Sequence, residues 1–298
     1  MIPFIDAHSH LHGLPYQDWE ILGMCGVRAV VLSCSNPNVH REIHSEPPGY
    51  EAMLRYWEGP LLLSRAAERT HFFQVYLGIA ISSQTRVNDI DRLLVKMEEL
   101  LQDEAVVAVG ELGLDPIQYF GFSWPLEEQA VVMEEQIKMA ARLGKPVILH
   151  TPTPKRGQDF LGALAHGDLP PSQEYKRVFL EKDLEIIARA GLDQRRVVVD
   201  HGDETIIEDV LDKTQAWIGL SIGSALRKTG PKEAALFVKR YGAERIMLNS
   251  DHISYLPYDL FAIPKAIREM KRLNVPESEI RRAVFDNANA FYGLGLTP

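Results

Sequence analysis

Three histidines stand at alternate positions near the start of the chain. The stretch "DAHSHLHG" covers residues 6–13 and follows the short apolar run "MIPFI". In an extended strand, residues i and i+2 point to the same face, so His8 and His10 can present two ring nitrogens to one point. Imidazole is a good ligand for zinc, manganese or iron. The spacing therefore predicts part of a metal site, with His12 as a candidate substrate contact at the same mouth.

Further histidines and carboxylates follow other apolar runs. Glu111 ends "VVAVGE", His150 ends "PVILH", His201 follows "RVVVD" and Asp251 follows "RIMLNS". Any one of them alone could be a hydrogen-bonded structural residue or a cap. Their joint placement at the ends of apolar runs favours metal binding instead. Four imidazoles and two carboxylates suit two divalent ions, with a position left open for water.

The elements that must hold these residues alternate along the chain. Short runs rich in Val, Ile and Leu predict strands buried on both faces, at residues 2–7, 27–33, 72–79, 106–111, 146–150, 196–200, 216–221 and 245–250. Helical spacing of apolar residues lies between them, at 88–104, 125–144, 205–213, 231–242 and 276–293. Thr205 and Glu208 have the spacing of a capping box.

Eight strands that alternate with helices predict an α/β fold, a (β/α)8 TIM barrel. An open doubly wound sheet is the alternative, but the first turn lacks the G-x-G-x-x-G pattern of its commonest cofactor site. Residues 35–69 form the least regular part and predict an enlarged loop after strand two. We find no linker or internal repeat, so a single domain over residues 1–298 is favoured.

Composition bounds the environment and the partners. The chain has 298 residues, 46% of them hydrophobic and 24% charged, and a formal net charge of −9. It contains no apolar run long enough to span a membrane and no secretory signal pattern, so no membrane partner is expected. Cys25 and Cys34 suggest no disulfide framework, which predicts a reducing, cytoplasmic location. The acidic balance argues against a broad nucleic-acid surface, so nucleic acid is possible but not favoured. The oligomeric state is not predicted.

The chain resembles the TatD-related branch of the metal-dependent amidohydrolase-type barrels. The resemblance rests on "DAHSHLH", "VVAVGELGLD", "EEQIKMAARLGKPVILHTP", "VVVDH", "RIMLNSD" and "NANAFYGL", which occur in the family's order over nearly the whole chain. The segments "HTP" and "LNSD" look closer to a less-described group of predicted TIM-barrel hydrolases than to the TatD nucleases.

The resemblance implies roles for the six candidate ligands. Glu111 stands where the family has its shared metal carboxylate, and Asp251 where it has the residue that holds metal and takes a proton from water. One ion is expected at His8, His10, Glu111 and Asp251, and a second at Glu111, His150 and His201. Zinc is favoured, with manganese or magnesium as alternatives.

The departures from the family concern the substrate side. TatD nucleases usually carry His-Pro after strand three, Glu-Thr-Asp at strand eight and an "HCF"-like segment after strand six. Here the corresponding stretches are residues 78–81 ("GIAI"), 249–251 ("NSD") and 200–204 ("DHGDE"). Metal-dependent hydrolysis is thus supported by the resemblance, and nuclease specificity is not.

Three functions remain open at this point. The favoured one is a binuclear metal-dependent hydrolase of a small-molecule phosphoester, amide or lactone. The others are a TatD-like deoxyribonuclease and, in a different class, a non-catalytic barrel that retains metal and binds a ligand. The adjacent cations Lys155 and Arg156 follow a predicted ligand in "HTPTPKRGQDF". They predict contact with a phosphate or carboxylate group of the substrate.

Overall fold

Eight parallel strands form the centre of the molecule. The computed structural model describes residues 2–35, 47–83, 86–118, 123–152, 164–165, 174–223, 229–253 and 258–298. The strands are hydrogen-bonded in the order β1-β2-β3-β4-β6-β8-β9-β10. Their bounds are β1 Phe4–Ser9, β2 Val27–Cys34, β3 Gln74–Ile79, β4 Val106–Leu112, β6 Val147–Leu149, β8 Val197–Val199, β9 Trp217–Ser221 and β10 Ile246–Asn249.

The first and last strands close the sheet into a barrel. The backbone N–H of His10 donates to the His252 carbonyl at 2.8 Å, and that of Asp251 donates to the His8 carbonyl at 3.0 Å. A parallel bridge also joins His10 to Ile253. The predicted TIM barrel is therefore confirmed, and the open sheet is excluded.

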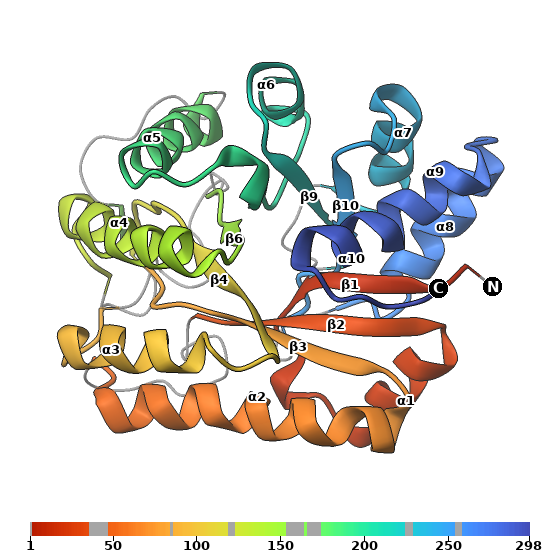
Figure 1. Ribbon diagram of the computed structural model, residues 1–298. Helices are drawn as coiled ribbons and strands as arrows, with labels where there is room; N and C mark the ends of the chain where they lie inside the picture. Colours follow the sequence, from red (N-terminus) through yellow and green to blue (C-terminus); the bar gives the residue numbers. More distant parts are fainter. Residues whose placement is uncertain are drawn as a thin grey trace.

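Helices surround the strands (Figure 1). They are α1 Tyr16–Met24, α2 Tyr50–His71, α3 Ile90–Leu100, α4 Leu126–Leu143, α5 Tyr175–Arg189, α6 Ile207–Lys213, α7 Pro231–Tyr241, α8 Ala262–Arg272, α9 Glu277–Arg281 and α10 Asn287–Tyr292. Every residue of β1, β6, β8 and β10 is buried, as expected for strands covered on both faces. None of the described helices is long and apolar enough to cross a membrane.

Two short strands form a separate antiparallel pair, β5 Ile117–Gln118 with β7 Leu164–Ala165. The sequence analysis did not predict these two strands, because no apolar run marks them. The predicted connection at 35–69 contains most of α2, a helix of 22 residues. Residues 36–46 of that connection lie outside the described part of the chain.

Two sequence predictions of local structure were wrong. β1 ends at Ser9, two residues later than predicted, so His8 lies within the strand. The predicted capping box at Thr205 is absent, because α6 begins at Ile207. Both the backbone N–H and the hydroxyl of Thr205 donate to one oxygen of Asp203 instead, at 3.0 and 2.5 Å. A nearer acceptor thus holds Thr205 in a turn before the helix.

Candidate metal centre

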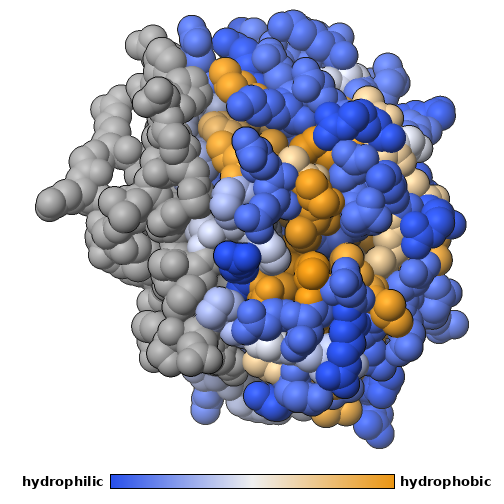
Figure 2. Space-filling model, turned by 90° about the vertical axis from the view of Figure 1, so that its left-hand side faces the viewer, coloured by the Kyte–Doolittle hydropathy of each residue, from blue (hydrophilic) through white to orange (hydrophobic). Residues whose placement is uncertain are grey.

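The six predicted ligands lie at the carboxyl ends of the strands. In Figure 1 the chain's two termini lie together on the right, and β1 runs from that side toward the left. Because the strands are parallel, their carboxyl ends meet on the left, where chemistry is expected in a barrel of this kind. Figure 2 looks onto this side and shows apolar residues gathered in the middle among polar ones. The structure brings the six side chains together in two groups.

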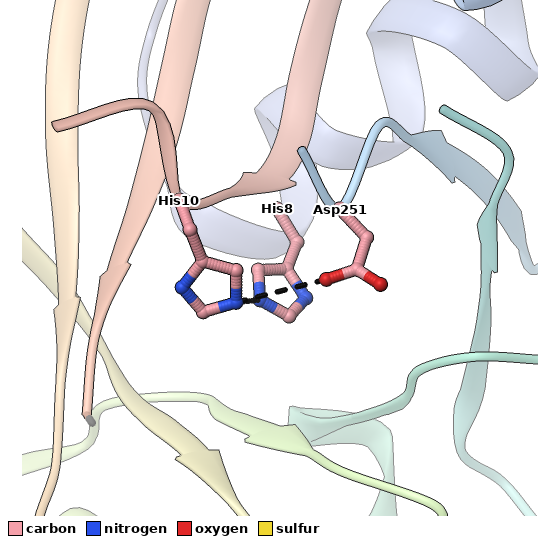
Figure 3. Close-up of side chains that lie close together, drawn as sticks. All are labelled: His8, His10 and Asp251. Carbon is pink, nitrogen blue, oxygen red and sulfur yellow. Dashed lines mark hydrogen bonds and ion pairs between the residues drawn. The ribbon is translucent and has the colours of Figure 1, made fainter. Parts of the chain in front are cut away.

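The first group consists of His8, His10 and Asp251 (Figure 3). The Nε2 atoms of His8 and His10 are 3.2 Å apart, and Nε2 of His10 is 3.6 Å from Oδ1 of Asp251. One oxygen of Glu111, Oε2, lies 3.6 Å from Nε2 of His8 and 3.5 Å from Nε2 of His10. The ligand atoms of His8, His10 and Asp251 all lie within 4.8 Å of one another.

These spacings fit a metal ion. Ligands at 2.0–2.1 Å from a tetrahedral zinc ion are about 3.3 Å from one another. Four distances among the first group and Oε2 of Glu111 are 3.2 to 3.6 Å, and the three atoms of the group lie within 4.8 Å of one another. Two imidazole nitrogens whose lone pairs converge at 3.2 Å also require a proton or a cation between them. The first group could therefore hold an ion with little rearrangement.

The second group consists of Glu111, His150 and His201. The other oxygen of Glu111, Oε1, lies 2.6 Å from Nδ1 of His150 and 2.6 Å from Nε2 of His201. The two nitrogens are 3.1 Å apart. Distances of 2.6 Å are those of short hydrogen bonds, so Oε1 must withdraw by several tenths of an ångström to share an ion. The two oxygens of Glu111 therefore face one group each.

Close approach of two strands places Glu111 beside His150. A Cβ atom on Gly113 would lie 2.3 Å from the His150 carbonyl oxygen, so only glycine permits this separation. The Glu111 N–H donates to the Ser33 hydroxyl at 3.0 Å, which ties the end of β4 to β2. The carboxylate is thereby fixed between strands on its two sides.

Two ligands need unusual backbone angles to reach the centre. His201 has φ 60° and Asp251 has φ 48°, values that non-glycine residues adopt rarely and mostly at functional sites. The buried Lys176 ammonium stabilises the backbone at His201 by donating to the His201 carbonyl at 2.6 Å and to Asp203 at 2.8 Å. Asp251 lies between the groups, since its Oδ2 is 3.7 Å from Nδ1 of His201.

Burial and charge act against each other at this site. Burial opposes the charge of His8, but the carboxylates of Glu111 and Asp200 outweigh it and raise the pKa of His8 to about 9. Burial likewise opposes the charge of His150, and Glu111 raises its pKa to about 9. Burial would raise the pKa of Glu111, but the imidazoles around it, His150 first among them, hold it well below its ordinary value. The site therefore attracts positive charge, as protons or as metal ions.

The predicted substrate contacts lie elsewhere or are not described. Nε2 of His12 is 3.0 Å from Sγ of Cys34, and its ring stacks on Tyr56 at 5.6 Å. His12 therefore contacts β2 and α2 and belongs to neither ligand group. Lys155 and Arg156 lie outside the described residues. The substrate roles of these three residues stay predictions.

The candidate ligands have supporting residues that the sequence did not single out. The Asp200 carboxylate accepts from Nδ1 of His8 at 2.6 Å, and Asp115 lies 3.3 Å from Nε2 of His150. Both residues stand in quoted motifs, "VVVDH" and "GELGLD". A carboxylate next to a predicted ligand was a usable signal for Asp200, because histidine ligands commonly donate their second N–H to a carboxylate.

Two curated relatives resemble the chain in sequence. An uncharacterized metal-dependent hydrolase of Methanocaldococcus jannaschii is 25% identical over 290 residues, which are 97% of this chain and 100% of that protein. A 3'-5' ssDNA/RNA exonuclease TatD of Edwardsiella piscicida is 37% identical over 95 residues, which are 30% of this chain and 35% of the exonuclease. The first likeness covers whole proteins and the second only a segment.

Two solved structures share the fold. A TatD-like protein of Archaeoglobus fulgidus has a TM-score of 0.69 and 23% identity, covering 97% of this chain and 100% of its own. A phosphotriesterase homology protein of Escherichia coli has a TM-score of 0.64 and 15% identity, covering 98% and 99%. The family described as TatD related DNase matches residues 5–293. This chain therefore belongs to the TatD family and is a metal-dependent hydrolase.

Proposed function

We propose that this hydrolase works with two divalent ions, one in each ligand group. The observation that carries the proposal is the placement of Glu111, whose two carboxylate oxygens face different groups. A carboxylate in that position can bridge two ions. His8, His10 and Asp251 would complete one site, and His150 and His201 the other.

Zinc is the metal we favour. Four of the six candidate ligands are imidazoles, which suit zinc, whereas magnesium prefers an all-oxygen octahedral sphere. Manganese accepts mixed nitrogen and oxygen ligands and is the alternative. Distances of 3.2 to 3.6 Å among His8, His10, Asp251 and Glu111 are close to those between the ligands of a zinc ion.

Asp251 is the proton acceptor in this proposal. Divalent ions bound here would polarise the substrate and lower the pKa of the attacking water. Asp251 is buried, with 1% of its surface exposed, and its two oxygens face His10 and His201. It can therefore hold a proton between the two groups and deliver it to the leaving group.

The substrate we propose is a small molecule with a phosphoester, amide or lactone bond. The fold is shared with a phosphotriesterase homology protein whose structure was determined with phosphate in its active site. Lys155 and Arg156 follow the candidate ligand His150 within six residues and could contact an anionic group. The net charge of −9 disfavours a long polyanion such as DNA.

A metal-dependent deoxyribonuclease is the second candidate. The family is described as TatD related DNase, and a segment of the chain resembles a ssDNA/RNA exonuclease. TatD nucleases usually carry His-Pro after β3, where this chain has Ala80 and Ile81. This difference disfavours the substrate contacts that those nucleases make. A single panel of substrates separates the two candidates.

The test is metal-dependent turnover by the purified protein. The protein is stripped with a chelator, reloaded with zinc, manganese or magnesium, and assayed on phosphomonoesters, phosphodiesters, lactones, dipeptides and single-stranded DNA. We expect Asp251→Asn to keep at least one metal and to lose turnover, and the exposed Asp212→Asn to behave as wild type. Turnover of DNA alone overturns the small-molecule proposal, and normal turnover by Asp251→Asn overturns the role of Asp251.

Two broader predictions also stay proposals. We propose that residues 1–298 form a single domain, since the eight strands use the chain from Phe4 to Asn249. We also propose a cytoplasmic location, which is supported by two free cysteines, Cys25 and Cys34.

A further inference from the structure

We infer that Asp200 is the positioning residue that fixes His8 for metal binding, and that Gly219 is glycine in order to admit its carboxylate. The inference rests on the proposed function, because it concerns an ion held by His8. The inference goes beyond the proposed function by assigning roles to two residues outside both ligand groups.

Both oxygens of Asp200 have a partner. Oδ2 accepts from Nδ1 of His8 at 2.6 Å, and Oδ1 accepts from the Asn249 amide at 2.8 Å. The three side chains are buried, with 0% to 1% of their surface exposed. A carboxylate held at both oxygens fixes the ring of His8 and keeps the hydrogen on Nδ1. The lone pair of Nε2 is then directed toward His10 and Glu111.

The space for this carboxylate comes from Gly219 on β9. A Cβ atom at that position would lie 1.6 Å from Oδ1 of Asp200 and 3.0 Å from Nδ2 of Asn249. Gly219 lies within a regular strand, paired with Met247 of β10, where a glycine ordinarily weakens the strand. Close approach of the Asp200 side chain accounts for the glycine.

The turn at His201 lets two consecutive residues serve the same site. Side chains of neighbouring residues in a strand point to opposite faces, yet Asp200 contacts His8 and His201 contacts Glu111. The left-handed backbone of His201, at φ 60°, breaks the alternation directly after β8. The Thr151 hydroxyl donates to the Asp200 carbonyl at 2.5 Å and fixes the backbone before the turn.

The test is a double-mutant cycle read out as metal affinity. Zinc is titrated into stripped protein in competition with a chromophoric chelator, and the two dissociation constants are resolved. We expect Asp200→Ala to weaken one site by about 10- to 100-fold, the usual effect of losing such a partner. Gly219→Ala should weaken the same site, because its methyl group displaces the carboxylate. In the Asp200→Ala background, Gly219→Ala should change affinity by less than about twofold, as expected when both act through one contact.

The metal-free protein gives a second readout. A short hydrogen bond from Nδ1 of His8 should give a low-field proton resonance, which Asp200→Ala and Gly219→Ala abolish. The control is Asp183→Asn, a buried carboxylate that accepts from the Leu114 N–H and lies near His150 of the second group rather than near His8. It should change neither the resonance nor the affinity of the site that contains His8. Should an alanine variant fail to fold, Asp200→Asn tests the same contact with the shape retained.

The outcomes separate this inference from the proposed function. A wild-type protein that binds no metal overturns the proposed function and this inference with it. A wild-type protein that binds two ions, with unchanged affinities in Asp200→Ala, overturns this inference alone. Independent, additive losses from Asp200→Ala and Gly219→Ala overturn the role of Gly219.

Discussion

Replacing Glu111 by glutamine is the sharpest test of a shared carboxylate. Glu111→Gln keeps the size of the side chain but removes its charge, and it turns one oxygen into an NH2 group. Wild-type Oε1 faces His150 and His201, and Oε2 faces His8 and His10. A single amide cannot present an oxygen to both groups. Both sites should therefore weaken, and the group that meets the NH2 should weaken more.

The magnitude follows from the burial of the carboxylate. Only 12% of the Glu111 side chain is exposed, and four imidazoles surround it. Removing one partner of a buried charge pair costs about 3–5 kcal/mol, and tenfold in affinity corresponds to about 1.4 kcal/mol. The expected loss is therefore about 100- to 3,000-fold per site, from these two magnitudes. The group that keeps an oxygen should lie near the lower limit.

The assay is chelator competition with elemental analysis of the dialysed protein. Wild type should retain two equivalents of zinc. His150→Gln should lose only the second site, and the exposed Glu135→Gln should retain both. The shared role is refuted if Glu111→Gln and His150→Gln lose the same single equivalent, because Glu111 would then serve one group alone.

Three further outcomes are expected. Zinc binding at pH 7 should release about two protons, because His8 and His150 have pKa values of about 9 and must lose a proton to bind metal. Calorimetry in buffers of different ionisation enthalpy measures the number of protons released. That number should fall as the pH passes 9. Burial raises the pKa of Asp183 well above its ordinary value, so wild-type stability should fall with rising pH between the unfolded and folded pKa values, by up to about 1.4 kcal/mol per pH unit. Asp183→Asn should remove that fall in urea unfolding measured from about pH 4 upward, and parallel curves for the two proteins would contradict it. Lys155→Ala and Arg156→Ala should raise KM for an anionic substrate, with a larger increase at low salt. An unchanged kcat/KM in both variants would refute the proposed contact with an anionic group.

Sequence predicted the strands well because their signal is local. "AVVL" and "VVAVG" are apolar throughout, and strands covered on both faces need such runs. The ends of the strands were harder to predict, since they depend on pairing with a neighbouring strand. β1 continues to Ser9 because Ser9 pairs with Leu32 of β2, and nothing in "DAHSH" reveals that partner.

The candidate ligands were predictable for a similar reason. Each stands at the end of a local apolar run, and parallel strands place such ends together. The supporting residues had a weaker sequence signal, which for Asp200 was its place next to a ligand. Asp200 precedes a ligand, and strict alternation would point the two side chains apart. Only the φ of 60° at His201 brings both into the site. Gly219 likewise has no space for a side chain because the Asp200 carboxylate lies there, and the sequence around Gly219 does not reveal this contact.

Closure of the barrel and assembly of the first ligand group depend on the same residues. His8 lies in the first strand and His10 directly after it, and Asp251 follows the last strand, so this group exists only when the ends of the sheet meet. Two backbone bonds that join the ends each involve a candidate ligand, from the Asp251 N–H to the His8 carbonyl and from the His10 N–H to the carbonyl of His252. Contacts between residues 242 and 243 positions apart in sequence cost entropy before they stabilise anything. An ion bound by His8, His10 and Asp251 would hold this seam directly, whereas one bound by His150 and its partners would join strands that are already neighbours. A metal ion in the first candidate group would therefore stabilise the closed barrel as well as supply the proposed chemistry.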